Sequence, residues 1–524
     1  MPNKIVNNLS LDNSFTEFKS AIRQGIPSAV FGVNDSFKNY LLSGIENPLL
    51  IVVHDNLTAS LFADYLRAYT DKKIVCIPQK DESLILSRAF SKDTLYKRLK
   101  GIAELPNANV VIATAESLMQ PIDGKLSSFI LQKDCDYKRE DYLNFLINAG
   151  YKRVESVENK GTFCIRGDIL DVYPIDGDNP FRVDFFGDTV ESIKAFDVET
   201  RKNLGFFDKI TIIQAVEFSY SQEELNVMLA TIKTDVKKAR GDGATRLKSI
   251  YEDVCFAVEN KDFDALSNLN FFCKAKTYIF DLMPKDTVVI FDEPKRIAKT
   301  CELVYTEFSE RFNSLYSAGE VFGAEQFNLL PVEDLTDGLN KKLCACLQTI
   351  SAEIPFFRPL KIINPQVSGV ADYRLDIKEV YNDLKNWQRG GYRVIVLADT
   401  PKRAEIFMDD LAPNGLGATI TPIASEKGIS ILIGKLDSGF IYHEDKLVVI
   451  GSGNLFTKSR EKQKFKPKKQ TFFTAPEIGD YCVHEVHGIG RALGNKKIST
   501  TEGTKDYVAV EYHGGDVLYV PVEQ

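Results

Sequence analysis

The sequence is poor in histidine, methionine and tryptophan, and it contains no long hydrophobic run. Its 524 residues include 5 histidines, 5 methionines and 1 tryptophan. Three of the histidines, His484, His487 and His513, lie close to the end of the sequence, but no carboxylate spacing there resembles a metal site, so we expect no metal. No apolar stretch reaches the length of roughly 18 residues that a membrane helix needs, and no basic segment precedes an apolar one near the start. We therefore expect no membrane span, no secretion and a cytoplasmic location.

The 9 cysteines are scattered along the chain and include no C-x-x-C pair. Cys344 and Cys346 are the one close pair, and their spacing fits neither a zinc ribbon nor a disulfide framework. This usage is typical of a protein in a reducing cytoplasm.

Charge is moderate and slightly acidic. Hydrophobic residues make up 44% and charged residues 26% of the chain, with a net charge of -8, which is the composition of a folded protein of about three to five domains. Any contact with nucleic acid would need a local basic patch. One such run, 457–470, holds 7 basic residues and 1 acidic residue. It is typical of a solvated linker within 456–477, and the alternative is a tether that contacts phosphates.

The first part of the chain predicts an α/β domain with a parallel sheet. Short apolar strands at 29–32, 48–54, 74–78 and 109–113 alternate with helical segments. Strands that are apolar throughout are typical of a parallel sheet with helices on both faces. We place the first half of this domain at 1–120 and the second half at 205–335.

A degenerate phosphate loop follows the first of these strands. A functional loop reads G-x-x-x-x-G-K-[ST], in which the second glycine allows the backbone to close on phosphate and the hydroxyl binds magnesium. Here Gly32 and Lys38 are kept, but Phe37 replaces the second glycine and Asn39 replaces the hydroxyl. We expect that the Phe37 ring occupies the phosphate space and that this loop binds no nucleotide.

The partner of that loop is expected far downstream. Residues 286–294 read D-T-V-V-I-F-D-E-P, a strand that ends in Asp292 and Glu293. This has the form of a Walker B motif, which holds magnesium in active enzymes. The sequence therefore predicts a degenerate P-loop-type domain that is split by an insertion.

The insertion contains the most regular alternation in the chain. Residues 158–197 predict a β-hairpin or meander, because apolar and polar residues alternate around turn residues at 174–180. In F-R-V-D-F-F, period two places Arg182 and Phe186 on one face. Two interpretations are open. In the first, Phe186 packs inside the protein while Arg182 pairs with Asp184 or a neighbour. In the second, Arg182 and Phe186 form a binding face.

The remaining segments predict helices, a second sheet and a small barrel. Residues 222–274 have helical spacing, with Phe271, Phe272 and Cys273 closing the helix pair. Residues 332–353 are interpreted as a polar helical connector, assigned to 336–354, and 355–455 as a second small α/β domain. Short strands with glycine turns over 478–524 predict a small antiparallel β-barrel of the Tudor or SH3 kind.

Two of these segments resemble known families. The run 161–174, with R-G-D-I and D-V-Y-P, resembles the second domain shared by excinuclease B and the bacterial transcription-repair coupling factors. In both families this domain binds excinuclease A. The resemblance implies that the insertion, 121–204, does so through Arg166, Arg182 and Phe186. In the coupling factors this face is covered by a C-terminal domain until activation.

The end of the chain resembles the RNA-polymerase-interacting domain of the coupling factors, which is also found in CarD transcription regulators. The match runs over 479–522 and includes G-D-Y-C-V-H-E-V-H-G-I-G-R. The resemblance implies binding to the polymerase β subunit through the strand 494–500, with Ile498 central and Lys496 and Lys497 beside it. The family often has tyrosine where this chain has Ala492.

Taken together, these resemblances identify the sequence as similar to the N-terminal part of a coupling factor. They imply recognition of stalled polymerase and recruitment of excinuclease A to DNA damage. They also imply an ATP- and magnesium-dependent translocase on double-stranded DNA that would follow this segment, so we expect a fragment with no cofactor and no enzyme activity of its own. The alternatives are an excinuclease B-like repair protein, which needs an intact ATP loop, and a CarD-like regulator, which is much shorter.

Overall fold

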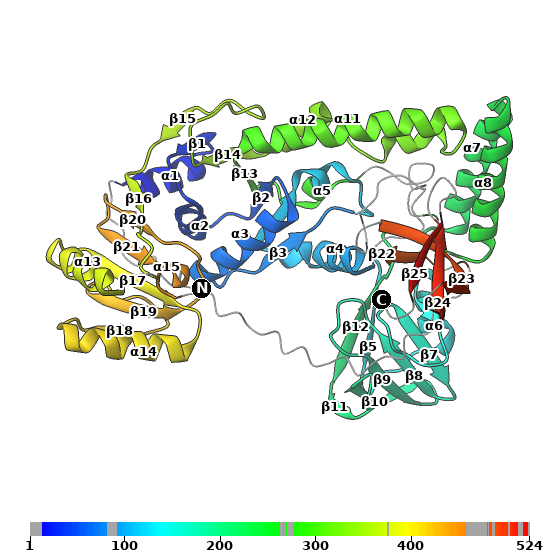
Figure 1. Cartoon of the computed structure of the whole chain (residues 1–524), viewed down its shortest axis with the longest axis horizontal. Helices are drawn as coiled ribbons and strands as arrows, with labels where there is room; N and C mark the ends of the chain where they lie inside the picture. The colour runs from blue at the N-terminus through cyan, green and yellow to red at the C-terminus, as the bar shows by residue number, and fades with distance from the viewer. Residues whose placement is uncertain are drawn as a thin grey trace. The chain divides into compact units, whose positions relative to one another are not determined.

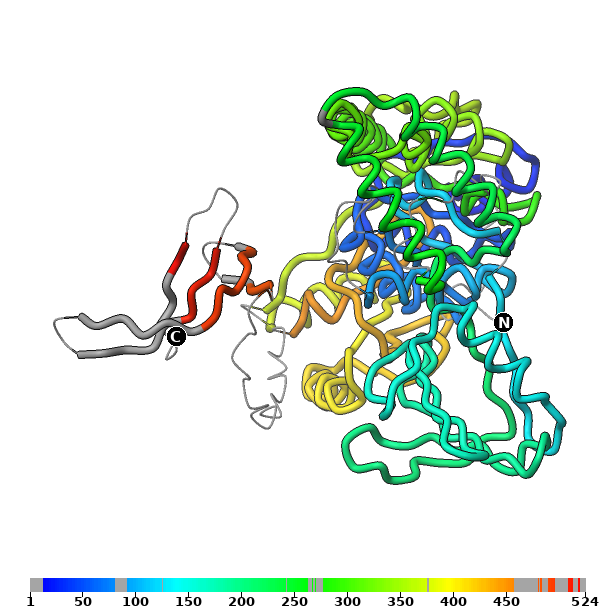
Figure 2. The backbone as a smooth tube through the Cα atoms, turned by 90° about the vertical axis from the view of Figure 1, so that its right-hand side faces the viewer, coloured from blue at the N-terminus to red at the C-terminus, as the bar shows by residue number. Residues whose placement is uncertain are grey.

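The computed structural model of the chain is shown in Figures 1 and 2. It describes residues 13–80, 92–124, 126–262, 266, 269, 277–374, 377–456, 479, 481–484, 488–500, 503–511 and 517–521. The chain divides into two compact units, Met1–Thr457 and Lys458–Gln524. The basic run 457–470 lies outside the described residues.

The first unit is built on a seven-stranded parallel sheet in the order β15-β1-β14-β13-β2-β4-β3. Its strands are β1 (Ser28–Phe31), β2 (Leu49–Val53), β3 (Ile74–Ile77), β4 (Val110–Thr114), β13 (Val288–Asp292), β14 (Leu343–Gln348) and β15 (Lys361–Ile363). Strands β2, β4 and β13 are buried along their whole length, as expected for a parallel sheet covered on both faces. The prediction of a parallel sheet is confirmed.

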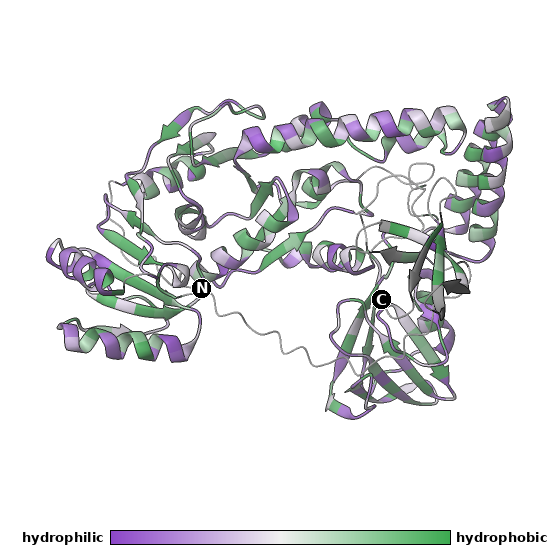
Figure 3. Cartoon of the chain, viewed as in Figure 1, coloured by the Kyte–Doolittle hydropathy of each residue, from purple (hydrophilic) through white to green (hydrophobic). Residues whose placement is uncertain are grey.

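Helices cover both faces of this sheet. They are α1 (Ser14–Arg23), α2 (Asp35–Ser43), α3 (Asn56–Tyr69), α4 (Lys92–Glu104), α5 (Ala115–Met119), α10 (Ile279–Leu282), α11 (Pro294–Ala318) and α12 (Val332–Leu339), with short 3-10 turns η1 (Leu105–Asn107) and η3 (Gly323–Phe327). Neighbouring residues of β2 belong to different hydrophobic cores, Ile51 to one and Leu50 to the other, because successive strand residues point to opposite faces. Figure 3 shows the matching contrast, with hydrophobic colour along the strands and mixed bands along α11.

Two predictions about this sheet are wrong. The segment interpreted as a helical connector, 332–353, begins with α12 but continues into β14, which lies between β1 and β13. Strand β15, which we assigned to the second α/β domain, pairs with β1 and belongs to the first. The membership of both strands in the sheet depends on contacts with strands far away in the sequence, which local patterns do not contain.

The insertion forms a six-stranded sheet in the order β11-β10-β9-β8-β7-β6 and a two-stranded sheet of β5 and β12. The elements are β5 (Ser128–Gln132), α6 (Arg139–Asn148), β6 (Lys152–Arg153), β7 (Thr162–Arg166), β8 (Ile169–Tyr173), β9 (Phe181–Phe186), β10 (Thr189–Phe196), β11 (Asn203–Phe206) and β12 (Lys209–Ile213). The meander is confirmed. Because β12 pairs with β5 along its whole length, the module continues past residue 204, where we had ended it.

A pair of helices follows the insertion. Helix α7 (Gln222–Lys238) begins with a capping box in which Ser221 and Glu224 bond reciprocally, and α8 (Asp242–Glu259) packs beside it (Figures 1 and 2). The predicted closure of the pair by Phe271, Phe272 and Cys273 lies outside the described residues.

Another six-stranded sheet, which follows these elements in the chain, completes the first unit. Its strand order is β16-β20-β21-β17-β19-β18. Its elements are β16 (Val367–Gly369), α13 (Ile377–Arg389), β17 (Arg393–Ala398), α14 (Pro401–Leu411), η4 (Ala412–Asn414), β18 (Ala418–Ile420), β19 (Ile429–Ile433), β20 (Phe440–Tyr442), β21 (Leu447–Ile450) and α15 (Ser452–Leu455). This is the small α/β arrangement that the sequence predicts.

The second unit is a four-stranded antiparallel sheet. Its strands, in spatial and chain order, are β22 (Tyr481–His484), β23 (Gly488–Thr500), β24 (Gly503–Glu511) and β25 (Val517–Pro521). Among all described residues, no helix is long and apolar enough to cross a membrane.

Candidate partner-binding face and degenerate nucleotide loop

Strand β9 separates an apolar inner face from a polar outer face. Val183 and Phe185 are buried, and the Phe185 ring stacks on Tyr142 with 5.1 Å between centroids. The intervening residues point to the other side, where Phe186 is 81% exposed. The predicted alternation is therefore present, and Phe186 does not pack inside the protein.

Arg182 is held in place on the outer face by an acidic neighbour. Its Nε and Nη2 donate to the two carboxylate oxygens of Asp171, at 2.6 and 2.7 Å. This double hydrogen bond raises the pKa of Arg182. The sequence offered Asp184 or a neighbour as partner; Asp184 instead bonds Ser192 and Lys194. The arginine is thus oriented and still partly exposed.

Arg166 and Phe186 lie at the same end of the sheet. Each is the last residue of its strand before a glycine turn, at Gly167 (φ 60°) and Gly187 (φ 62°), a backbone region that favours glycine. The two turns are neighbours, because the Phe185 amide donates to the Asp168 carbonyl at 2.8 Å. The chain therefore brings an exposed arginine and an exposed phenylalanine, 20 residues apart by their numbers, to one edge.

Two further apolar side chains on this face were not predicted. Ile169, 37% exposed, lies opposite Arg166, and Phe206, 72% exposed, lies opposite Lys194. Lys194 is itself opposite Arg182, and directly opposed residues of antiparallel strands share a face. Their position depends on strand register, for which the sequence carries no local signal except the apolar residues themselves. We call Arg166, Ile169, Arg182, Phe186 and Phe206 the outer face.

The degenerate nucleotide loop joins β1 to α2. Asn34 caps α2 by accepting from the Phe37 amide at 2.9 Å. Phe37 is fully buried, and its ring contacts Phe440 and Tyr442 of β20, at 5.1 and 4.9 Å between centroids. The ring therefore belongs to the core between the loop and β20. Our expectation that it points into the phosphate space is wrong.

Lys38 is buried in an ion cluster with the Walker B-like acids. Its side chain is 1% exposed, and Nζ lies 2.7 Å from Asp292, 2.8 Å from Glu293 and 3.3 Å from Asp35. Glu293 also accepts from the amide and hydroxyl of Thr349. Lys38 thus bonds both Asp292 and Glu293.

The pKa shifts describe the charges in this cluster. Burial alone would lower the pKa of Lys38, but Asp292 and Glu293 outweigh it and raise that pKa. Burial raises the pKa of Asp292, although Lys38 acts in the opposite direction. For Glu293 burial acts upward as well, but Lys38 and Thr349 together lower the pKa. Of the two carboxylates, the less buried Glu293 is therefore the one whose pKa is lowered.

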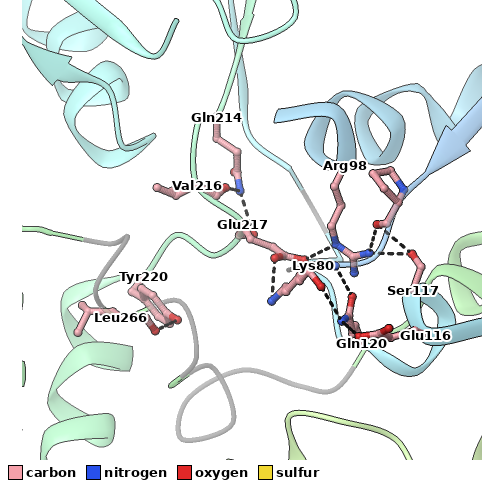
Figure 4. A network of polar contacts seen from close by, with 11 residues as sticks. Lys80, Arg98, Glu116, Ser117, Gln120, Gln214, Val216, Glu217, Tyr220 and Leu266 are labelled. Atoms are coloured by element: carbon pink, nitrogen blue, oxygen red, sulfur yellow. Dashed lines mark hydrogen bonds and ion pairs between the residues drawn. The ribbon is translucent and has the colours of Figure 1, made fainter. Parts of the chain in front are cut away.

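A second buried ion cluster joins the insertion to the parallel-sheet domain (Figure 4). Glu217, just after β12, accepts from Arg98 of α4 at 2.9 Å and lies 2.7 Å from Lys80. Arg98 also donates to Ser117 and to the Pro78 carbonyl. Lys80 and Arg98 lower the pKa of Glu217 against the effect of burial. This cluster fixes the point at which the chain returns from the insertion.

The polymerase-binding residues proposed from the sequence lie on strand β23. In the backbone register Lys496 faces Tyr507, Lys497 faces Asp506 and Ile498 faces Lys505 of β24. Their side chains lie outside what the structure describes.

Comparison with protein families gives a match in each of two segments. A family model described as the UvrB interaction domain matches residues 129–218, and one described as the CarD-like/TRCF RID domain matches residues 477–524. Each of the two segments with a resemblance in the sequence therefore contains a match to a known family domain.

Curated relatives that match nearly the whole chain are titled transcription-repair-coupling factors. The one from Bacillus subtilis is 25% identical over 97% of this chain, and one from Staphylococcus epidermidis is 26% identical over 100% of it. The match covers 46% of each relative, so this chain spans about half the length of those proteins. Among solved structures, a chain titled XPD_Helicase covers 81% of this chain at 11% identity and a TM-score of 0.23, which is too low to support an argument.

Proposed function

We propose that this chain is the part of a transcription-repair-coupling factor that binds its two protein partners. The insertion binds excinuclease A through the outer face, and the C-terminal unit binds the β subunit of RNA polymerase. Joining the two partners would bring the repair machinery to polymerase stalled at DNA damage in the cytoplasm. The observation that carries this proposal is the outer face, with Arg166 and Phe186 at one edge.

The outer face has the chemistry of a protein-binding hot spot. Arginine and aromatic residues dominate such sites, and removal of one costs about 2 kcal/mol or more of binding free energy. Arg182 is already oriented by Asp171, so less side-chain freedom is lost on binding. Phe186 supplies an exposed ring that can enter an apolar pocket of the partner.

The parallel-sheet domain acts as a scaffold in this proposal. Lys38, Asp292 and Glu293 are the residue types that would bind ATP phosphates and magnesium in an active site. Two observations support the loss of that site: Lys38 bonds both Asp292 and Glu293, and Asn39 cannot replace the magnesium-binding hydroxyl. ATP, magnesium and double-stranded DNA are bound by the longer protein, as an ATP-dependent translocase.

The C-terminal unit is proposed to close into a small Tudor- or SH3-like barrel that docks on polymerase. Strand β23 would present Lys496, Lys497 and Ile498 to the polymerase. Calorimetric titration with the isolated β subunit tests this. Ile498→Ala should weaken binding about tenfold, equivalent to 1.4 kcal/mol, whereas Ile130→Ala in the insertion should leave it unchanged.

Calorimetric titration of the chain with excinuclease A tests the insertion. Arg166→Ala should weaken binding about tenfold. Arg67→Ala, which removes an exposed arginine from α3, is the matched control and should bind like wild type. Equal affinity of both variants would show that Arg166 is not part of the interface.

A further inference from the structure

The carboxyl edge of the parallel sheet contains a cavity that the proposed function does not use. Its volume is about 320 Å³, at the lower end of the range for ligand pockets. The lining residues are Glu293, Lys295, Arg296, Lys299, Gln348, Ile350 and Ala352. They come from the start of α11 and from the segment after β14, so the cavity lies where parallel sheets commonly bind ligands.

Three cations lie at the N-terminal end of α11, where positive charge destabilises a helix. Lys295, Arg296 and Lys299 occupy its first two turns, and its first turn contains no acid. A helix N-terminus carries partial positive charge and favours anions. None of the three forms an ion pair with another residue that the structure describes, although Arg296 interacts electrostatically with Asp55. The three cations therefore outnumber the described acids near this end of the helix, which are the capping residue Glu293 and Asp55.

Gln348 adds a buried donor without a partner. Its side chain is 1% exposed, and its Oε1 accepts from the Ala352 amide at 2.7 Å. That bond fixes the orientation of the side-chain amide. The Nε2 group is buried and has no hydrogen-bond partner. Buried donors are almost always satisfied, so an acceptor in the cavity would complete this group.

The one carboxylate in the lining, Glu293, is bound through one of its two oxygens. Both Lys38 and Thr349 bond Glu293, through contacts of 2.7 to 2.8 Å to its Oε1. Apart from the second oxygen of Glu293, the charged and polar groups of the lining are three cations and one amide donor. This set of donors suits a multiply charged oxyanion, since phosphate oxygens accept several charge-assisted hydrogen bonds.

We propose that this cavity binds a phosphate group, held by Lys295, Arg296, Lys299 and the Nε2 of Gln348. The site adjoins the degenerate nucleotide loop through Glu293 but differs from it, because Lys38 bonds the carboxylates of Asp292 and Glu293 and does not line the cavity. The phosphate comes either from a free anion or from a nucleic-acid backbone. No hydrolysis is part of this proposal, and it does not depend on either protein partner.

The test measures binding of three probes to the whole chain: inorganic phosphate, ATP without magnesium, and a short DNA duplex. The double variant Lys295→Gln, Lys299→Gln should weaken binding by tenfold or more. The control is Lys233→Gln, Lys237→Gln, which removes two exposed lysines at the same spacing from α7 and should bind like wild type. Gln348→Glu keeps the acceptor for Ala352 but replaces the amide donor with a carboxylate, and should also weaken binding tenfold.

The pattern among probes identifies the source of the phosphate. Binding of inorganic phosphate and ATP that is weakened by the α11 and Gln348 substitutions supports a site for a free anion. Binding of DNA alone, with the same sensitivity and a steep loss on addition of salt, supports backbone contact. The proposal is overturned if no probe binds at about 10 mM, where a Kd near 1 mM is detectable, or if the α11 and α7 variants bind alike.

Discussion

Two regions of this chain contain a basic residue and a phenylalanine close together, and the structure places them in opposite environments. Phe37 and Lys38 lie on α2, and both are buried. Arg182 and Phe186 lie on β9, where the arginine is partly exposed and the ring is 81% exposed. The first pair contacts the protein's own core and carboxylates. In the second pair Arg182 bonds Asp171 but stays partly exposed, and the Phe186 ring faces outward. Exposure and partners therefore distinguish a pair that stabilises the fold from one that is left accessible, for which we propose a role in binding.

The largest expected effect is on the buried ring. Phe37→Ala should lower the free energy of unfolding by about 3–5 kcal/mol, because the substitution leaves a cavity beside Phe440 and Tyr442. Phe186→Ala should change it by less than about 0.5 kcal/mol, as is usual for exposed residues. Urea unfolding followed by circular dichroism measures both. A similar loss of unfolding free energy in the two variants would contradict the contrast between the buried and the exposed ring.

Removal of the Lys38 charge should have the next largest effect. Lys38→Met keeps most of the side-chain volume but leaves Asp292 and Glu293 without their cation, and breaking a buried ion pair in this way costs about 3 kcal/mol or more. The control is Lys248→Met, at an exposed position of α8. A second measurement, DNA-stimulated ATP turnover, should be absent in wild type. Turnover that Lys38→Met abolishes would contradict the scaffold role.

Substitution of Arg182 should lower both the stability of the chain and its affinity for excinuclease A. Arg182→Ala leaves the buried Asp171 carboxylate without its double hydrogen bond, so stability should fall by about 1–2 kcal/mol. Binding to excinuclease A should also weaken. The double variant Arg182→Ala, Asp171→Ala should recover part of the stability without recovering binding. Recovery of both would mean that Arg182 acts only inside the sheet.

The smallest effect is expected from pH at the join between the insertion and the parallel-sheet domain. The pKa of Glu217 is lowered from 4.5 in the folded protein, so its contribution to stability is present above that pH and is lost as pH falls through the folded value. Wild type should therefore be more stable than Glu217→Gln at pH 7, and the difference should shrink below pH 4.5. A difference that stays constant would show that the charge of Glu217 is not what joins these elements.

The sequence predicted those features that depend on local pattern. Alternation on β9 separated Phe185 from Phe186 correctly, and apolar strands between helices predicted the parallel sheet. Strands β14 and β15 were misassigned because their place in the sheet depends on pairing with β1. Ile169 and Phe206 were missed for the same reason, since strand register brings them to the outer face. The loop motif predicted a defect at Phe37, but only tertiary packing reveals that its ring turns toward β20.

The most direct test of the central claim is the affinity of the chain for excinuclease A when one exposed ring is removed. Phe186→Ala should weaken binding by tenfold or more, equivalent to at least about 1.4 kcal/mol, with unfolding unchanged. Phe256→Ala, on α8 and 69% exposed, should bind like wild type. Wild-type affinity in Phe186→Ala, or an equal loss in both variants, would contradict the assignment of the outer face as the binding site.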